Sequence, residues 1–116
     1  MEIKIVKDSI AKKELADIAE KQFGDLVKAV VDIQQEIMAI GGELHADEEV
    51  VLIEHEKSKR EYIWGINLYP KKKEQEWIEF DSMINIKPSF GNRSRGIDNF
   101  TVKEKIRNIV KKLVSK

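Results

Sequence analysis

The sequence predicts an α+β fold, with a mainly antiparallel sheet of about five strands and two or three helices packed on one face of it. Three observations support this prediction. Alternating or β-branched segments recur along the chain, amphipathic segments of helical period lie near both ends, and turn residues separate them. An N-terminal strand at 2–6 and two hairpins would supply the five strands. There is no repeat and no linker, so we expect a single domain over residues 1–116.

After the N-terminal strand, the first third of the chain predicts a helix and a hairpin. Ser9 can cap a helix over 10–23, whose apolar residues have helical spacing. Gly24 can end this helix because glycine readily adopts a left-handed conformation. The β-branched segment 26–33 and the apolar segment 37–40 then predict the first hairpin.

The middle of the chain contains one segment with two interpretations. Asp47 can cap a helix over 48–55, with further acidic residues in its first turn. The continuous apolar run 50–53 is also compatible with a buried strand. We favour the helix. The alternating segments 62–69 and 77–86 predict the second hairpin.

The C-terminal segment predicts a basic amphipathic helix. Thr101 and Glu104 have the spacing of a capping box, and an apolar stripe follows at helical period. Clustered lysines can bind a phosphate backbone, which makes nucleic acid one candidate partner. The helix has no aromatic residues on which bases could stack, so a solvated face is the favoured interpretation.

Charges are balanced in number but unevenly distributed. There are 21 lysine and arginine residues and 21 aspartate and glutamate residues, so the net charge is zero. Segment 32–56 has eight acidic residues and no lysine or arginine, whereas 87–116 has nine basic residues and two acidic ones. The two segments could face each other across the fold or across a homodimer, or they could contact nucleic acid or metal.

Composition excludes several kinds of site. Without cysteine, the chain has no disulfide, no thiol nucleophile and no cysteine-built zinc or iron–sulfur site. Its two histidines, His45 and His55, are not near a nucleophile-elbow pattern. No apolar run has the length of a signal peptide or a membrane span, so we expect a cytoplasmic protein without membrane contact. Whether the protein is an enzyme stays open.

Three residues could bind a divalent metal, which is the one cofactor we consider. If 41–47 is extended, Glu43, His45 and Asp47 share one face, and such a site could activate water for hydrolysis. Their spacing matches no established zinc motif. In the competing interpretation, His45 forms a local hydrogen bond and Asp47 caps a helix.

The loop at 92–96 is the leading candidate for a ligand site. Asn92, Arg93, Ser94 and Arg95 could present side-chain and backbone donors to a phosphate or carboxylate. The loop lacks the glycine spacing and the lysine of a P-loop. In the competing interpretation, the arginines pair with the acidic segment.

A polar row on the second hairpin could add to this site. It contains Asn67, Asp81 and Asn85, with Glu79 on the same face as Asp81. Two carboxylates so placed could act as acid and base if burial separated their pKa values. In the competing interpretation, this polar row is simply the solvent-exposed face of a sheet.

Four segments together resemble those of a known family. They are GGELHAD at 41–47, WGINLYP at 64–70, WIEFDSMINIKP at 77–88 and NRSRG at 92–96. In this order they resemble a small bacterial and archaeal family known as domain of unknown function 5674. The resemblance covers nearly the whole chain. It implies a prokaryotic protein with no assigned activity and transfers no catalytic residue.

The function is therefore unknown from the sequence. We expect a small cytosolic binding or interaction module that binds an anionic small molecule through the loop at 92–96. A metal-dependent hydrolase and a nucleic-acid-binding protein are the alternatives.

Overall fold

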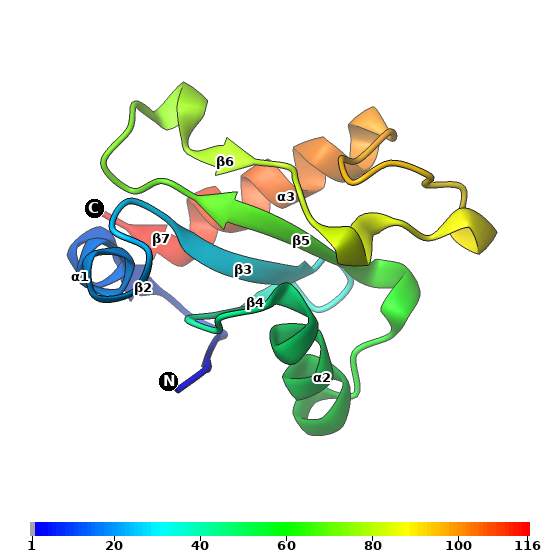
Figure 1. The fold of residues 1–116 in the computed structure, drawn as a ribbon, viewed down its shortest axis with the longest axis horizontal. Coiled ribbons are helices and arrows are strands. Elements are labelled where there is room, and N and C mark those ends of the chain that lie inside the picture. Colours follow the sequence, from blue (N-terminus) through cyan, green and yellow to red (C-terminus); the bar gives the residue numbers. More distant parts are fainter. Residues whose placement is uncertain (1) are drawn as a thin grey trace.

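The computed structural model describes residues 2–116, and its centre is a five-stranded antiparallel sheet in the order β1-β4-β3-β5-β6 (Figure 1). The strands of this sheet are β1 (Lys4–Val6), β3 (Val27–Asp32), β4 (Ile37–Ile40), β5 (Ile63–Leu68) and β6 (Ile78–Glu79). The helices are α1 (Lys12–Gln22), α2 (His45–Glu56) and α3 (Phe100–Leu113). A separate parallel pair joins β2 (Ile10–Ala11) to β7 (Val114–Ser115). The expected α+β class and the five-stranded sheet are confirmed.

Short 3-10 helices complete the structure. They are η1 (Arg60–Tyr62), η2 (Glu74–Glu76), η3 (Met83–Asn85) and η4 (Pro88–Phe90). No helix in residues 2–116 is long and apolar enough to cross a membrane.

Helices cover both faces of the sheet, which corrects the expectation of a single covered face. The core against α1 and α3 contains Val31 of β3 and Ile66 of β5, together with Leu15 and Ile106 from the helices. A second core on the opposite face contains Leu52 of α2. Every residue of β4 and β5 is buried. A strand buried on both faces has no polar side to leave in water, so helices are needed on each side.

The first hairpin forms as expected, with Asp32 of β3 opposite Ile37 of β4. Asp32 is fully buried, which is unusual for a carboxylate. Its oxygens accept hydrogen bonds from the backbone N–H groups of Gln34 and Gln35, at 2.8 and 3.0 Å, and from Ser58 Oγ at 2.7 Å. These bonds replace the lost hydration and tie the hairpin turn to the end of α2.

The second hairpin is much shorter than the predicted pair 62–69 and 77–86. Only Ile78 and Glu79 pair with β5, opposite Leu68 and Asn67. Beyond β6 the chain turns into η3. There the side chain of Asn85, instead of a strand backbone, forms hydrogen bonds with the backbone of Gly65 in β5. A Cβ at Gly65 would lie 2.5 Å from Ser82 Oγ, so only glycine lets this segment approach β5.

Each helix begins at a different residue from the predicted one. Ser9 does not cap α1, because the two residues that follow it pair as β2 with β7. The helical interpretation of 48–55 is confirmed, but α2 begins at His45, so Asp47 lies inside its first turn. The cap of α3 is Asn99, whose side chain accepts from Val102 N at 3.1 Å, rather than Thr101.

Candidate functional site

Asn92 of the predicted anion loop is a structural residue. Its side chain is buried and closes the loop on itself. Nδ2 donates to the backbone oxygens of Asn85 and Gly96, each at 2.8 Å, and Oδ1 accepts from Asp98 N at 2.8 Å. These bonds use the polar atoms of Asn92 within the fold.

The other side chains of the loop differ in their contacts. Ser94 Oγ donates to Asp98 Oδ1 at 2.9 Å, and Arg95 Nε donates to Asp81 Oδ1 at 2.7 Å. Arg93 is exposed, and within residues 2–116 it makes no hydrogen bond or ion pair. Arg93 is therefore the one arginine of this loop whose charge is uncommitted in the described part of the chain.

Asn85 also supports the fold. It is fully buried, and it joins β5 to the loop through both ends of its amide. Oδ1 accepts from Gly65 N at 2.8 Å, while Nδ2 donates to Gly65 O and Arg95 O, each at 2.9 Å. This amide pairs with the open edge of β5 much as a neighbouring strand would.

The rest of the predicted polar row forms one network at the edge of the sheet. Asn67 Nδ2 and Tyr69 Oη both donate to Glu79 Oε1, at 2.8 and 3.1 Å. Asn67 also donates to the backbone oxygen of Asp81, at 3.4 Å. Tertiary structure thus brings Asn67, Asp81 and Arg95 together. Asn67 Nδ2 and Arg95 Nε donate within this network, whereas Asn67 Oδ1 is buried without a hydrogen-bond partner among the described residues.

His45 joins the same region from the start of α2. Its Nε2 lies 2.8 Å from the backbone oxygen of Ile66, which fits a donated hydrogen bond. Burial lowers the pKa of His45 from its usual value, so the ring favours its neutral form at neutral pH.

The arrangement required for the metal site is not formed. Because α2 begins at His45, Glu43, His45 and Asp47 are not on one face of an extended segment. Glu43 and Asp47 are exposed, whereas His45 contacts a backbone oxygen. In residues 2–116 there is no group of three or more histidine, cysteine, aspartate or glutamate side chains that could hold a metal ion.

A buried acid, Glu48, and a buried lysine, Lys87, were missed by the sequence interpretation. Glu48 of α2 is fully buried; its Oε2 accepts from Gly42 N at 2.9 Å, and its Oε1 has no hydrogen-bond partner in the described chain. Burial raises the pKa of Glu48 well above its usual range. Lys87 donates to the backbone oxygens of Arg60, at 2.6 Å, and Ile63. Burial lowers the pKa of Lys87 to about 8.

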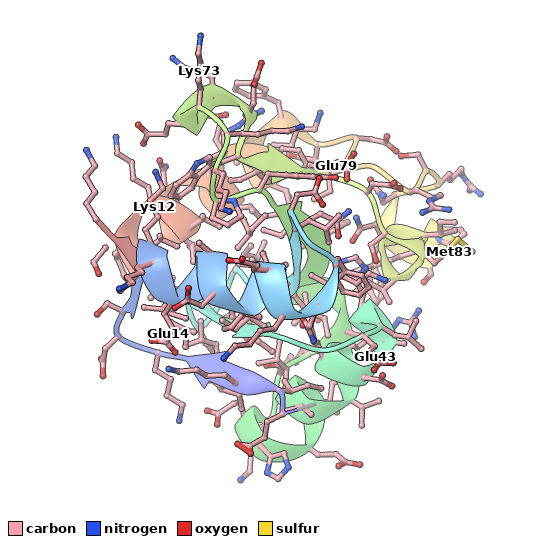
Figure 2. All side chains as sticks on the ribbon, turned by 60° about the vertical axis from the view of Figure 1, so that its left-hand side comes forward. Lys12, Glu14, Glu43, Lys73, Glu79 and Met83 are labelled. Atoms are coloured by element: carbon pink, nitrogen blue, oxygen red, sulfur yellow. The ribbon has the colours of Figure 1, made fainter. Side chains whose placement is uncertain are left out.

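Within residues 2–116, the acidic and basic segments form one ion pair with each other. Lys112 of α3 forms an ion pair with Glu36 at 2.7 Å, and both side chains are largely exposed. Figure 2 places Glu43, just before α2, far from Lys12 of α1. The other basic residues of α3 form no ion pair with segment 32–56 in the described part of the chain; they are Lys103, Lys105, Arg107 and Lys111.

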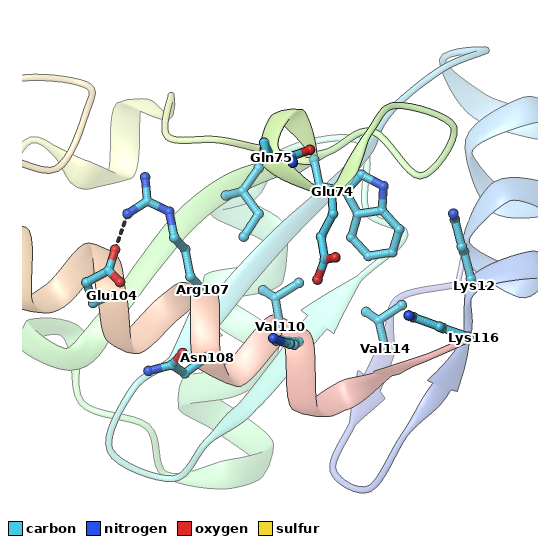
Figure 3. Close-up of a pocket in the computed structure, with 12 residues that line it drawn as sticks. Lys12, Glu74, Gln75, Glu104, Arg107, Asn108, Val110, Val114 and Lys116 are labelled. Carbon is cyan, nitrogen blue, oxygen red and sulfur yellow. Dashed lines mark hydrogen bonds and ion pairs between the residues drawn. The ribbon is translucent and has the colours of Figure 1, made fainter.

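A groove lies between α3 on one side and β6 with η2 on the other (Figure 3). Its volume is about 900 Å³. Four apolar side chains line it, namely Trp77, Ile78, Val110 and Val114. Its polar lining includes four basic residues, Lys12, Arg107, Lys111 and Lys116, and two acidic residues, Glu74 and Glu104. It joins an apolar wall to a rim with more positive than negative charge.

The charges of the groove are not all paired. Arg107 forms an ion pair with Glu104 one turn away on α3. Lys12, Lys111 and Lys116 are exposed and form no ion pair within residues 2–116. Glu74 points into the groove and supplies a negative charge of the chain itself (Figure 3).

Trp77 gives the groove an aromatic surface. Its ring is half-buried, and Nε1 donates to Lys72 O at 2.7 Å, which fixes the edge of the indole. Lys12 Nζ lies 5.0 Å from the ring centroid, within the range of a cation–π contact.

The comparisons with known proteins identify a family and no activity. The sequence model described as "Protein of unknown function (DUF5674)" matches residues 4–113. The chain belongs to this family. No curated protein and no solved structure shows a significant match to this DUF5674 chain. The resemblance noted in the sequence is thus confirmed, and the function has to be argued from the geometry.

The groove of this DUF5674 protein was not found from the sequence. Its lining comes from Lys12, from 74–78 and from 104–116. These segments are far apart in the chain, and none carries a motif of its own. The only local signal was the basic, amphipathic character of α3.

Proposed function

We propose that this protein is a binding module whose ligand lies in the groove between α3, β6 and η2. One observation carries the proposal: an apolar wall that includes Trp77 stands beside three lysines, Lys12, Lys111 and Lys116, that have no ion pair within the described chain. The ligand that fits this combination has a flat apolar group joined to an anionic group.

The physical properties of the groove suit such a ligand. A volume of about 900 Å³ is within the usual range for small-molecule sites. Apolar surface buried against the part-exposed Trp77 and Ile78 would supply most of the affinity, since burial of apolar area is the main favourable term. The lysines would orient the anionic end and speed association. Glu74 opposes anion binding because its carboxylate points into the groove, so the anionic end of a ligand has to bind away from it.

This proposal keeps the expected anionic small molecule and moves its site. In the loop at 92–96, Asn92, Ser94 and Arg95 already bond within the fold. Anion binding by the loop at 92–96 now depends on Arg93 alone and stays a separate prediction. The variant Arg93→Ala tests that prediction directly. If the groove is the site, this variant binds an anionic probe as tightly as the unchanged protein does.

We also propose a cytoplasmic location, supported by a cysteine-free composition that suits a reducing compartment. A homodimer remains a prediction that sedimentation of the purified protein would test.

The test is titration with anilinonaphthalene sulfonate, a fluorescent anion with flat apolar rings. We expect the double variant with Lys12→Gln and Lys111→Gln to bind this probe about tenfold more weakly, equivalent to roughly 1.4 kcal/mol for two charges. Lys13→Gln is the matched control, because Lys13 is an exposed neighbour of Lys12 outside the groove lining. Equal affinity of the double variant and the control would refute the proposed site.

A further inference from the structure

We propose that the natural ligand of the groove is a short stretch of single-stranded nucleic acid. This inference rests on the proposed function and names the ligand class of that same site. Its basis is that aromatic rings from the strand side alternate with cations from α1 and α3 along one track. This track is defined here by Lys12, Trp77, Arg107, Phe80 and Lys103.

Contacts between rings and cations define the track. Lys12 Nζ lies 5.0 Å from the centroid of Trp77. Farther along, the guanidinium carbon of Arg107 and Nζ of Lys103 lie 5.2 and 5.5 Å from the centroid of Phe80. Arg107 also lines the groove beside Trp77, so it connects the two rings. Both rings are half-buried and retain exposed surface.

The cations of α3 follow from helix geometry. Lys103, Arg107 and Lys111 are four residues apart, so they lie on one face of the helix. They extend over about 12 Å along its axis. The face that carries them borders the segment that bears Trp77 and Phe80. The result is a row of cations beside a row of rings.

Single-stranded nucleic acid matches this alternation. Each nucleotide offers one flat base and one phosphate, and base stacking on aromatic side chains is tolerant of sequence. Lysines and arginine beside the rings can pair with the phosphates. The absence of aromatic residues from α3 itself argued against nucleic acid in the sequence. Tertiary structure supplies them from the neighbouring segment 77–80.

Further charge surrounds the groove end of the track. The turn before η2 carries three exposed lysines, Lys71, Lys72 and Lys73, and Lys72 Nζ lies 4.3 Å from the ring centroid of Tyr69. Glu74, Glu76 and Glu104 reduce the local positive charge. We therefore expect binding that is weak at high salt. The acidic helix α2 packs on the opposite face of the sheet, where it does not face the track.

The experiment measures binding of a fluorescein-labelled oligouridylate of twelve nucleotides by anisotropy at several salt concentrations. We expect the logarithm of the binding constant to fall linearly with the logarithm of the salt concentration. For a single strand the slope is about −0.7 per phosphate contacted, so Arg107→Gln should reduce its magnitude by about 0.7. Lys13→Gln, outside the track, should leave both affinity and slope unchanged.

Trp77 supplies a second readout. Trp64 is buried, so quenching of tryptophan emission by the oligonucleotide reports mainly on Trp77. We expect Trp77→Leu to weaken binding by about fivefold or more with an unchanged salt slope, because stacking is lost while phosphate contacts remain. Phe90→Leu is the control, since Phe90 is an exposed aromatic outside the groove lining. Circular dichroism of each variant verifies that it is folded.

Each result has a defined meaning. If anilinonaphthalene sulfonate binds the groove and the oligonucleotide does not, the small-molecule site stands and the nucleic-acid proposal is overturned. If neither binds, both proposals fail. If Lys13→Gln weakens oligonucleotide binding as much as Arg107→Gln does, the binding is nonspecific and the track is refuted. Equal affinity for a duplex of the same length also overturns the proposal, because a duplex cannot stack its bases on Trp77.

Discussion

Asn85 provides the sharpest test of how the structure assigns roles to the predicted ligand residues. Asn85→Ala removes three hydrogen bonds. It leaves Gly65 N and Gly65 O buried without these partners, whereas Arg95 O keeps the bond from Ser82 N at 3.0 Å. Each buried backbone group that loses its partner costs roughly 1–3 kcal/mol, and a water that enters the new cavity lowers the total. For the two groups of Gly65 we therefore expect the free energy of unfolding to fall by about 2–6 kcal/mol, out of the roughly 5–15 kcal/mol typical of a domain.

The assay is urea unfolding followed by circular dichroism, with the midpoint and the slope compared between proteins. Asn108→Ala is the matched control, because Asn108 is exposed on α3 and makes no hydrogen bond through its side chain within residues 2–116. We expect the control to unfold within about 0.5 kcal/mol of the unchanged protein. A loss below about 1 kcal/mol in Asn85→Ala would refute the structural role. Loss of ligand binding without loss of stability would instead support the ligand role that the sequence suggested.

Two further predictions concern buried charges. The pKa of Glu48 is raised in the folded state, so between the unfolded and folded pKa values the folded protein holds a proton that the unfolded chain has released, and stability falls as pH rises. As pH rises across that window, Glu48→Gln should therefore gain stability relative to the unchanged protein by up to about 1.4 kcal/mol per pH unit. Urea unfolding from pH 4 to pH 8 measures this. If the free energies of unfolding of the two proteins change in parallel with pH, the prediction is contradicted. The pKa of Lys87 falls from 10.5 to about 8 on folding, so the unfolded chain binds more protons between these values and stability rises with pH there. Lys87→Met should remove this rise of stability with pH. Thermal unfolding between pH 7 and pH 10 measures it, and a variant whose stability still rises with pH would contradict the prediction.

Segments whose structure depends on local side-chain period could be predicted from the sequence. The first hairpin has its predicted strands because β-branched and apolar residues fill 27–32 and 37–40, with a polar turn between them. The basic amphipathic helix at the C-terminus is likewise present over Phe100–Leu113. In both cases the apolar residues that pack on the core recur at regular spacing within the segment itself, so the sequence of that segment is enough to predict its structure.

Segments whose structure depends on a distant partner were mispredicted. Alternation over 77–86 predicted a long strand, but only Ile78 and Glu79 pair with β5. Beyond them, Asn85 bonds to Gly65, which is twenty residues away in the chain. The placement of α2 on the second face is a similar case. Its inner face includes the buried acid Glu48, whereas the aliphatic Val50 is half exposed, so hydrophobic period could not orient it.

The sequence by itself determined the fold class, most strand and helix segments, the absence of thiol chemistry and the basic character of α3. These features depend on composition and on period over a few residues. Only tertiary structure decided that Asn85 and Asn92 bond within the fold and that Lys12, Trp77 and Lys111 line one groove. The physical reason is that hydrogen-bond partners and groove walls are set by distances in space, and residues that are remote along the chain carry no local signal of such proximity.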